Sequence, residues 1–161
     1  MKDAAVATAL LVLCSCLAAP GGQERHARSG ESPTPYATEL QFCVDQTNTY
    51  RAEVGRHPLK RSSALEHYAE TSARVDAMSR VPHQYFEQTD GGGIAEAENL
   101  IPWWPLDRYG SVREVVRRGL AGMWAEGPQG GHYRNIVGRY KEIGCGIYSD
   151  GKRITVVQVF R

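Results

Sequence analysis

Four residues in this sequence have the chemical types and the surroundings that a reactive site requires. They are two histidines and two glutamates, His83, Glu98, Glu126 and His132. Each lies in or beside a segment rich in glycine or proline rather than on a plain helix face. Imidazole and carboxylate groups bind divalent metals and act as general acids and bases. The four residues are therefore candidates for a metal site or a catalytic site.

Spacing alone does not make these residues a site. The sequence has no HExxH motif, no pair of CxxC motifs and no phosphate-binding loop. Distant histidines are more often surface residues, and this is the alternative interpretation. Two other histidines have simpler explanations, because His57 precedes Pro58 in a turn and His67 is expected on the surface of a helix.

Glu126 has the clearest electrostatic argument of the four. It lies at the C-terminal end of a predicted helix, where a carboxylate opposes the helix dipole. It must therefore be solvated or held there by a positive partner. His132 follows six residues later, and the flexible Gly130–Gly131 backbone would allow it to approach Glu126.

Three capping-box patterns predict where the helices that position these residues begin. They are Thr38-x-x-Gln41, Ser63-x-x-Glu66 and Ser111-x-x-Glu114. Apolar residues at helical spacing follow each pattern. We expect the first helix to end at Gly55 and the third to end before Gly127-Pro128.

The other segments predict a long loop and a β-hairpin. Residues 81–110 contain three consecutive glycines and the run Pro102-Trp103-Trp104-Pro105, which favour an irregular loop. Residues 143–148 and 154–160 are apolar or β-branched, and Asp150-Gly151 between them is a hairpin signal. Helices come first and strands last, so we predict an α+β domain with helices covering an antiparallel sheet.

Composition limits the size of the protein and its partners. The 161 residues are enough for one domain. Lysine and arginine total 19 and aspartate and glutamate total 18, which gives a net charge of +1. No basic surface therefore indicates a nucleic-acid partner.

The N-terminal segment resembles a targeting signal. Its apolar run is too short for a bilayer, which needs about 20 residues, and small residues follow it. We predict a signal peptide over residues 1–18. Leu13-Cys14-Ser15-Cys16 also resembles a bacterial lipobox, in which Cys16 would be lipidated, and both processing routes stay open. Residues 19–36 are predicted to be a flexible tether, and residues 37–161 the folded domain.

Cys43 and Cys145 are the two cysteines outside the N-terminal segment. Secretion would permit a disulfide between them, and two separate buried thiols are the alternative. Gly144 and Gly146 flank Cys145, and we expect them to admit a helix packed closely over a central strand.

Four motifs, in order along the chain, resemble those of the CAP superfamily. This superfamily includes the cysteine-rich secretory proteins, the antigen 5 allergens, the plant pathogenesis-related 1 proteins and many bacterial secreted proteins. The resemblance covers nearly the whole chain after the tether, and it implies a three-layer α-β-α sandwich with a central antiparallel sheet. The motifs are Thr47-Asn48-x-x-Arg51 with Pro58-Leu59-Lys60, Glu98-Asn99-Leu100, Trp124-Ala125-Glu126, and Gly131-His132-Tyr133 through Ile143-Gly144-Cys145-Gly146.

The resemblance also implies a cleft lined by His83, Glu98, Glu126 and His132. In some members of the superfamily the two histidines bind zinc or another divalent ion. His83 and His132 are accordingly the expected metal ligands, and one zinc ion is the expected cofactor. The sequence departs from the family pattern at several positions. Gln84 replaces the usual serine after the first cleft histidine, and Ala97 replaces the glycine before the glutamate.

Three functions fit these observations. We favour an extracellular or surface-anchored module that binds a lipid or a peptide, with Trp103 and Trp104 supplying apolar contact unless both fill the core. A metal-dependent hydrolase is the second, with Glu98 or Glu126 as general base for a metal-bound water. A structural or adhesive surface protein is the third. The expected location is outside the cell, or on its surface or in the periplasm as a lipoprotein. The sequence does not specify the oligomeric state.

Overall fold

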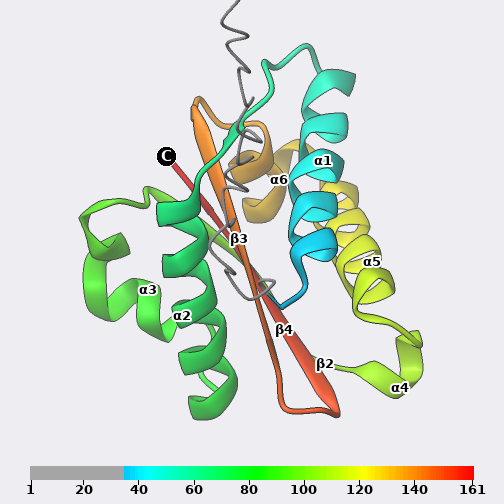
Figure 1. Ribbon diagram of the computed structural model, residues 1–161. Coiled ribbons are helices and arrows are strands. Elements are labelled where there is room, and N and C mark those ends of the chain that lie inside the picture. The colour runs from blue at the N-terminus through cyan, green and yellow to red at the C-terminus, as the bar shows by residue number, and fades with distance from the viewer. Residues whose placement is uncertain (1–34) are drawn as a thin grey trace, which may run out of the picture. The chain divides into compact units, whose positions relative to one another are not determined.

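A four-stranded mixed sheet lies between two groups of helices in the computed structural model, which describes residues 35–161 (Figure 1). The strands are β1 (Lys60–Arg61), β2 (Ala97–Pro105), β3 (Glu142–Ser149) and β4 (Arg153–Phe160). Their order is β1-β3-β4-β2, so β2 has a free edge. The predicted signal peptide, the lipobox at Cys16 and almost all of the tether lie outside the described residues.

Two helical layers cover the two faces of the sheet. One face carries α2 (Ser63–Ser79) and α3 (Gln84–Thr89), and the other carries α1 (Ala37–Glu53), α5 (Val112–Ala125) and α6 (Gly131–Ile136) (Figure 1). Short helical turns complete the chain, namely η1 (Asp90–Gly93), α4 (Leu106–Tyr109) and η2 (Gly127–Gln129). The α+β class and the three-layer arrangement are therefore confirmed. Among residues 35–161, no helix is both long and apolar enough to cross a membrane.

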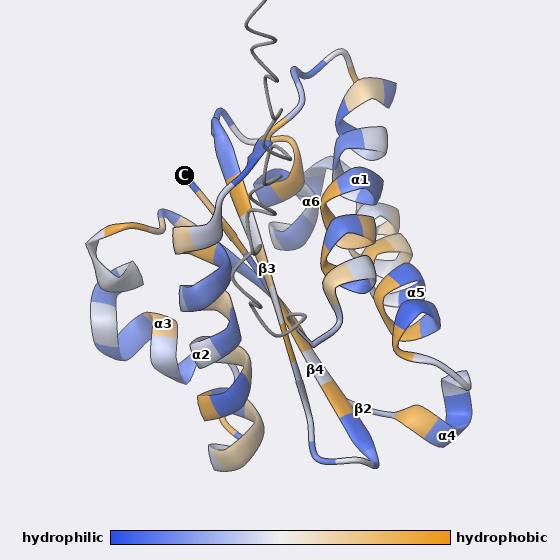
Figure 2. Cartoon of the chain, viewed as in Figure 1, coloured by the Kyte–Doolittle hydropathy of each residue, from blue (hydrophilic) through white to orange (hydrophobic). Residues whose placement is uncertain are grey.

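Strand β4 is buried along almost its whole length because both of its faces are covered. Val156 and Phe160 pack with α1, α5 and α6, whereas Val157 and Val159 pack with α2. A strand buried on both faces has an almost continuous apolar sequence, and residues 154–160 follow this rule. Figure 2 shows apolar residues along the strands and on the helix sides that face them.

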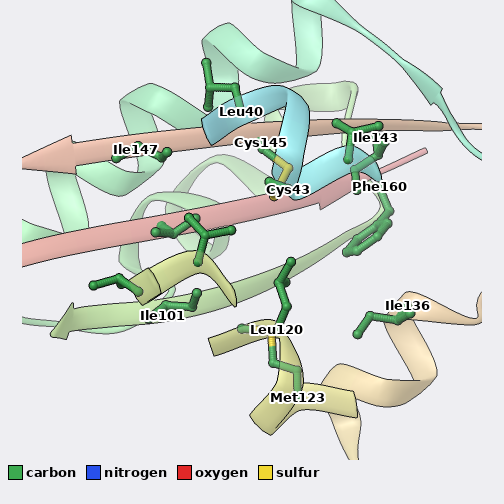
Figure 3. Packing of buried hydrophobic residues seen from close by; sticks show 14 of the residues in the cluster. Leu40, Cys43, Ile101, Leu120, Met123, Ile136, Ile143, Cys145, Ile147 and Phe160 are labelled. Carbon is green, nitrogen blue, oxygen red and sulfur yellow. A yellow bond between two sulfur atoms is a disulfide. The ribbon is translucent and has the colours of Figure 1, made fainter. Parts of the chain in front are cut away.

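A disulfide joins the first helix to the sheet. Cys43 on α1 and Cys145 on β3 are bonded and fully buried, with their Cα atoms 6.5 Å apart. They lie in the larger apolar core, close to Leu40 and Ile143 (Figure 3). The prediction of a bond, rather than two separate thiols, is confirmed.

Gly144 and Gly146 bring α2 against β3, as the sequence predicted. A Cβ atom on Gly144 would lie 2.2 Å from the carbonyl carbon of Leu65, and one on Gly146 would lie 2.1 Å from that of Ala69. These are backbone atoms of α2, which no side-chain rotation can move. The helix therefore packs at this distance only because both strand residues are glycines.

Of the three predicted capping boxes, only the third forms, and only its N-cap half, because the Glu114 carboxylate pairs with Arg117 and Arg118. The Ser111 hydroxyl accepts a hydrogen bond from the Glu114 amide at 3.2 Å and caps α5. Thr38 lies inside α1, where its hydroxyl donates to Glu39 instead. The N-cap of α2 is Ser62 rather than Ser63, and Glu66 pairs with Arg61. A side-chain partner nearby competes with the cap, and sequence spacing cannot detect that partner.

The prediction of one long loop over residues 81–110 is wrong. This stretch contains α3, η1, β2 and α4. Its prolines and glycines had indicated irregular structure, but an edge strand tolerates proline, and β2 has a register shift between Ile101 and Trp104. The expected antiparallel sheet is also mixed, because the two residues of β1 pair with β3 in parallel.

Candidate functional site

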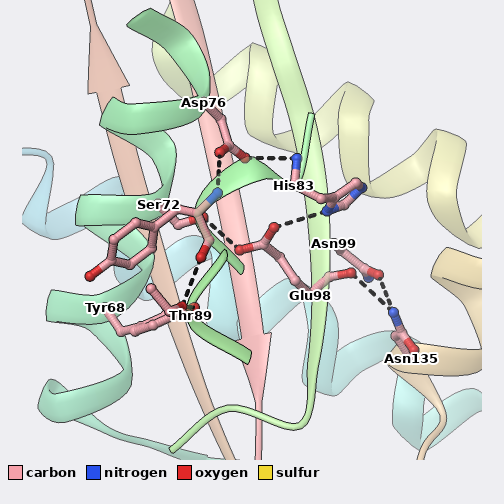
Figure 4. Close-up of polar contacts among 9 residues, drawn as sticks. Tyr68, Ser72, Asp76, His83, Thr89, Glu98, Asn99 and Asn135 are labelled. Carbon is pink, nitrogen blue, oxygen red and sulfur yellow. Dashed lines mark hydrogen bonds and ion pairs between the residues drawn. The ribbon is translucent and has the colours of Figure 1, made fainter. Parts of the chain in front are cut away.

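His83 and Glu98 form the first histidine–glutamate pair. Glu98 lies on β2, His83 directly precedes α3, and the imidazole Nδ1 is 2.9 Å from Glu98 Oε1 (Figure 4). The Glu98 side chain is only 1% exposed. Its second oxygen accepts a hydrogen bond from the Ser72 hydroxyl at 2.7 Å. Both oxygens of this buried carboxylate are therefore partnered.

Helix α2 holds His83 in place through Asp76. The fully buried Asp76 carboxylate accepts hydrogen bonds from the backbone amides of His83, at 2.9 Å, and of Tyr85, at 3.1 Å (Figure 4). These bonds satisfy amides at the start of α3, where His83 has a φ of 61°. The backbone of His83 is thus held in a left-handed conformation that few non-glycine residues adopt.

Sequence reasoning missed Ser72 and Asp76 as parts of this site. They lie four residues apart on the buried face of α2, among Leu65, Ala69 and Ala73. Two polar residues on an apolar helix face were the available signal, because buried polar groups need partners.

Glu126 and His132 form the second pair, so of the two alternatives for Glu126, solvation or a partner that holds it, the structure shows the partner. Glu126 caps the C-terminal end of α5, and His132 is in the first turn of α6. The His132 Nδ1 is 2.5 Å from Glu126 Oε1, and the His132 amide donates to Oε2 at 3.2 Å. Gly130 makes room for this contact, since a Cβ there would lie 2.2 Å from the Glu126 Cβ.

Hydrogen bonding within each pair shifts the pKa of one of its members, His83 in the first pair and Glu126 in the second. The hydrogen bond to Glu98 raises the pKa of His83, and burial opposes this effect. The hydrogen bond from His132 lowers the pKa of Glu126. Glu126 is therefore an anion at neutral pH. Asp76 differs, because burial raises its pKa.

Two asparagines connect the pairs across the free edge of β2. The Asn135 amide group, on α6, donates to the Glu98 carbonyl at 3.1 Å and to Asn99 Oδ1 at 2.9 Å (Figure 4). The Asn99 amide donates to the His132 carbonyl at 3.3 Å. Successive strand residues face opposite sides of a sheet, so Glu98 faces α2 while Asn99 faces the α6 layer. Each histidine thus bonds to its own glutamate. The side chains of Asn99 and Asn135 link the two pairs through the backbone carbonyls of His132 and Glu98.

An apolar pocket of about 220 Å³ adjoins the second pair. Strand β2 and helix α5 form its walls, and Glu126 and His132 border it. Trp104 is one of the lining residues and also stacks on Tyr109 with ring centroids 5.0 Å apart. Trp103 lies instead beneath the Arg80 guanidinium, 5.5 Å from it. The two tryptophans therefore have different environments, and neither is fully buried.

The donor chemistry of the two pairs fits a metal held by two imidazoles. Within residues 35–161, no group of three or more histidine, cysteine or acidic side chains is placed to hold a metal ion. Each Nδ1 is occupied by a glutamate, which leaves each Nε2 as the available ligand atom. Metal-binding histidines commonly bond a carboxylate through their other ring nitrogen in this way.

This chain belongs to the CAP, or cysteine-rich secretory protein, family. The family model matches residues 44–160, a range that contains all four candidate residues and Cys145, and it begins one residue after Cys43. The resemblance found in the sequence motifs is therefore confirmed. A search of curated proteins gave no match.

Three solved structures share the fold at low sequence identity. A cysteine-rich secretory protein from Staphylococcus aureus is 20% identical with a TM-score of 0.51, over 77% of this chain and 38% of that one. An outer surface protein from Borrelia burgdorferi is 16% identical with a TM-score of 0.54, over 80% and 96%. The nematode protein Na-ASP-1 is 19% identical with a TM-score of 0.54, over 76% and 36%. This chain thus spans little more than a third of the first and third proteins.

Proposed function

We propose that this protein is an extracellular or surface-bound CAP domain that binds a divalent metal ion through His83 and His132. Zinc is the preferred ion, since neutral imidazole is among its usual ligands. The observation that carries the proposal is the shared geometry of the two pairs. In each, a glutamate occupies Nδ1 and leaves Nε2 available to a metal.

The surrounding residues would fix the histidine rings before a metal arrives. The glutamates select the tautomer with the proton on Nδ1 and increase the basicity of Nε2. Asp76 holds the backbone of His83, and Asn99 holds that of His132. Two protein ligands leave further metal positions for water or for a group of a bound ligand, and the ion would supply Lewis acidity to that group.

Two contacts favour binding over hydrolysis. Ser72 is fully buried and bonds to Glu98 rather than to His83, so it lacks the exposed serine–histidine contact of an activated nucleophile. Both glutamates already accept hydrogen bonds at both oxygens, and neither is a free general base. We therefore retain hydrolysis by Glu98 or Glu126 only as an outcome to be tested.

The proposed location is supported by the secretory family and by the outer surface protein among the structural relatives. A lipid anchor at Cys16 is a further proposal, supported by the lipobox-like sequence. Replacing Cys16 with serine should then move the protein from the membrane fraction to the soluble fraction, and an unchanged distribution would exclude the anchor.

Zinc calorimetry on the full chain tests the metal site. We expect His83→Ala and His132→Ala each to abolish the same binding event, whereas His57→Ala, at an exposed histidine, should leave it unchanged. Heats that are equal in the wild type and both site variants would refute the proposal and favour a structural role. If zinc binds, a panel of peptide and ester substrates with and without chelator decides whether hydrolysis accompanies it.

Conservative variants test the role of the glutamates. Glu98→Gln and Glu126→Gln keep the side-chain shape, and we expect each to weaken zinc binding by about 10–100-fold, as loss of a ligand's hydrogen-bonded partner usually does. Unchanged affinity in both variants would show that the carboxylates do not orient the metal ligands.

A further inference from the structure

We propose that the pocket between β2 and α5 is an anchor site for one large apolar side chain of an extended peptide. The pocket lies beside His132, but its walls are apolar residues that a metal would not contact. The inference therefore goes beyond the metal site and does not depend on it.

The size of the pocket fits one side chain rather than a whole ligand. Its volume is about 220 Å³, below the roughly 300–1,000 Å³ of sites that enclose drug-sized molecules. A cavity of about 150 Å³ is sufficient for benzene. The walls include Ile101, Trp104 and Met123, so the space is lined by apolar surface suited to a branched aliphatic or aromatic group. Ile101 and Met123 are themselves buried members of the larger apolar core (Figure 3).

Gly122 is the second observation that indicates a ligand. It lies inside α5, where glycine is less favourable than alanine, and it lines the pocket. A Cβ atom there would meet nothing within 4 Å, so packing does not require glycine. Gly119, three residues earlier, differs, because its Cβ would lie 2.1 Å from Ile101 Cδ1. Gly119 admits β2 against α5, whereas Gly122 lines the pocket at a position where a Cβ atom would have no packing neighbour.

The polar border of the pocket favours a peptide over a fatty acid. Glu126 and His132 lie there, and the carboxylate of Glu126 would repel an anionic head group. The C-terminal end of α5 adds partial negative charge at the same place. A peptide main chain is neutral, and its N–H groups can donate to the Glu126 carboxylate. An extended peptide can therefore insert a side chain while its main chain stays on the polar border.

An NMR titration of the full chain with blocked amino acids, carried out in excess chelator, tests this inference. N-acetyl-leucine amide and N-acetyl-phenylalanine amide should shift the amide signals of Gly119, Gly122 and His132. N-acetyl-glycine amide should bind at least about tenfold more weakly, because it has no side chain to bury. Equal shifts from N-acetyl-glycine amide would overturn the proposal. Tighter binding of sodium octanoate than of N-acetyl-leucine amide would also overturn it, because that result would indicate a site for an alkyl anion. Chelator removes zinc, so failure here is separate from failure of the metal site.

Substitution at Gly122 supplies a variant that blocks the pocket without weakening the fold. Gly122→Leu should abolish the leucine-amide shifts while the thermal midpoint stays the same or rises, because leucine is a better helix former. Gly122→Ala removes less space and should weaken binding several-fold, which covers the case in which the leucine variant does not fold. Wild-type affinity in the alanine variant and in a folded leucine variant would refute the site.

Discussion

At the scale of single residues, the candidate site consists of pairs whose members come from different elements. His83 precedes α3 and reaches Glu98 on β2, and His132 on α6 reaches Glu126 at the end of α5. The pairs differ in burial. Glu98 is enclosed, whereas Glu126 and His132 are each about a third exposed. The first pair should consequently respond more strongly to the loss of a partner.

We predict that Glu98→Gln lowers the pKa of His83. The hydrogen bond to Glu98 raises the pKa of His83 above its ordinary value near 6.5. Protonated His83 paired with Glu98 therefore stabilises the fold fully below a pH of about 6.5. This stabilisation is lost as the pH rises through the folded-state pKa. NMR titration of the imidazole signals in the metal-free protein measures the shift directly. An unchanged His83 pKa in the glutamine variant would contradict the pairing.

Arg51 supplies a second prediction at the residue scale. This arginine is 2% exposed and donates to the carbonyls of His57, of Ile136 at the end of α6, and of Gly138 just beyond that helix. Arg51→Ala should lower the free energy of unfolding by about 3 kcal/mol, because one buried and two partly buried carbonyls lose a charged donor. Urea denaturation measures this. Arg56→Ala, at a nearby exposed position, should change stability by less than about 0.5 kcal/mol.

At the scale of elements, close packing of α2 on β3 positions the first pair. The same helix that lies over Gly144 and Gly146 also carries Ser72 and Asp76, which contact Glu98 and His83. If the helix moved away from the sheet, the hydrogen bonds to both residues would lengthen. The two glycines therefore affect the site although neither touches it.

We predict that Gly146→Ala destabilises the fold by about 3 kcal/mol, at the upper end for overpacking, because the new methyl group meets the backbone of α2. Gly131→Ala is the matched control, since a Cβ there meets nothing within 4 Å and its φ is not in the left-handed region. Thermal and urea unfolding should separate the two variants clearly. Equal stability would mean that α2 can move back from the sheet at little cost.

At the scale of the whole domain, one covalent bond joins the start of the fold to its end. The disulfide between Cys43 and Cys145 closes a loop with a sequence separation of 102, and it holds α1 against the strand that α2 covers from the other side. The proposed metal ligands, His83 and His132, come from the two helical layers, so the relative position of these layers governs the candidate site.

We predict that the double substitution Cys43→Ala and Cys145→Ala lowers the free energy of unfolding by about 2–5 kcal/mol. The loss arises mainly because the unfolded chain regains conformational freedom, and for a loop of this length the entropic effect is near the top of the range. Urea unfolding of the oxidised protein and the double variant measures it. A difference below about 1 kcal/mol would contradict this account.

The sequence by itself determined the elements whose signals are local. The β3–β4 hairpin follows from two apolar runs around Asp150-Gly151, and the Ser111 cap with Gly127-Pro128 sets the limits of α5. The approach of His132 to Glu126 was also predictable, because only six residues separate them and Gly130 removes the steric barrier. The four motifs, read in order, were enough to indicate the family.

Tertiary structure alone decided what depends on partners distant in the chain. Strand β2 was missed because its prolines disfavour a strand locally, and its pairing with β4 stabilises it instead. Ser72 and Asp76 were missed because they contact the candidate site only when α2 lies over Glu98 and His83. The apolar pocket that Gly122 lines likewise exists only when α5 packs on β2. Local patterns specify where a helix or hairpin forms, but burial and hydrogen bonding between distant segments decide which side chains share a site.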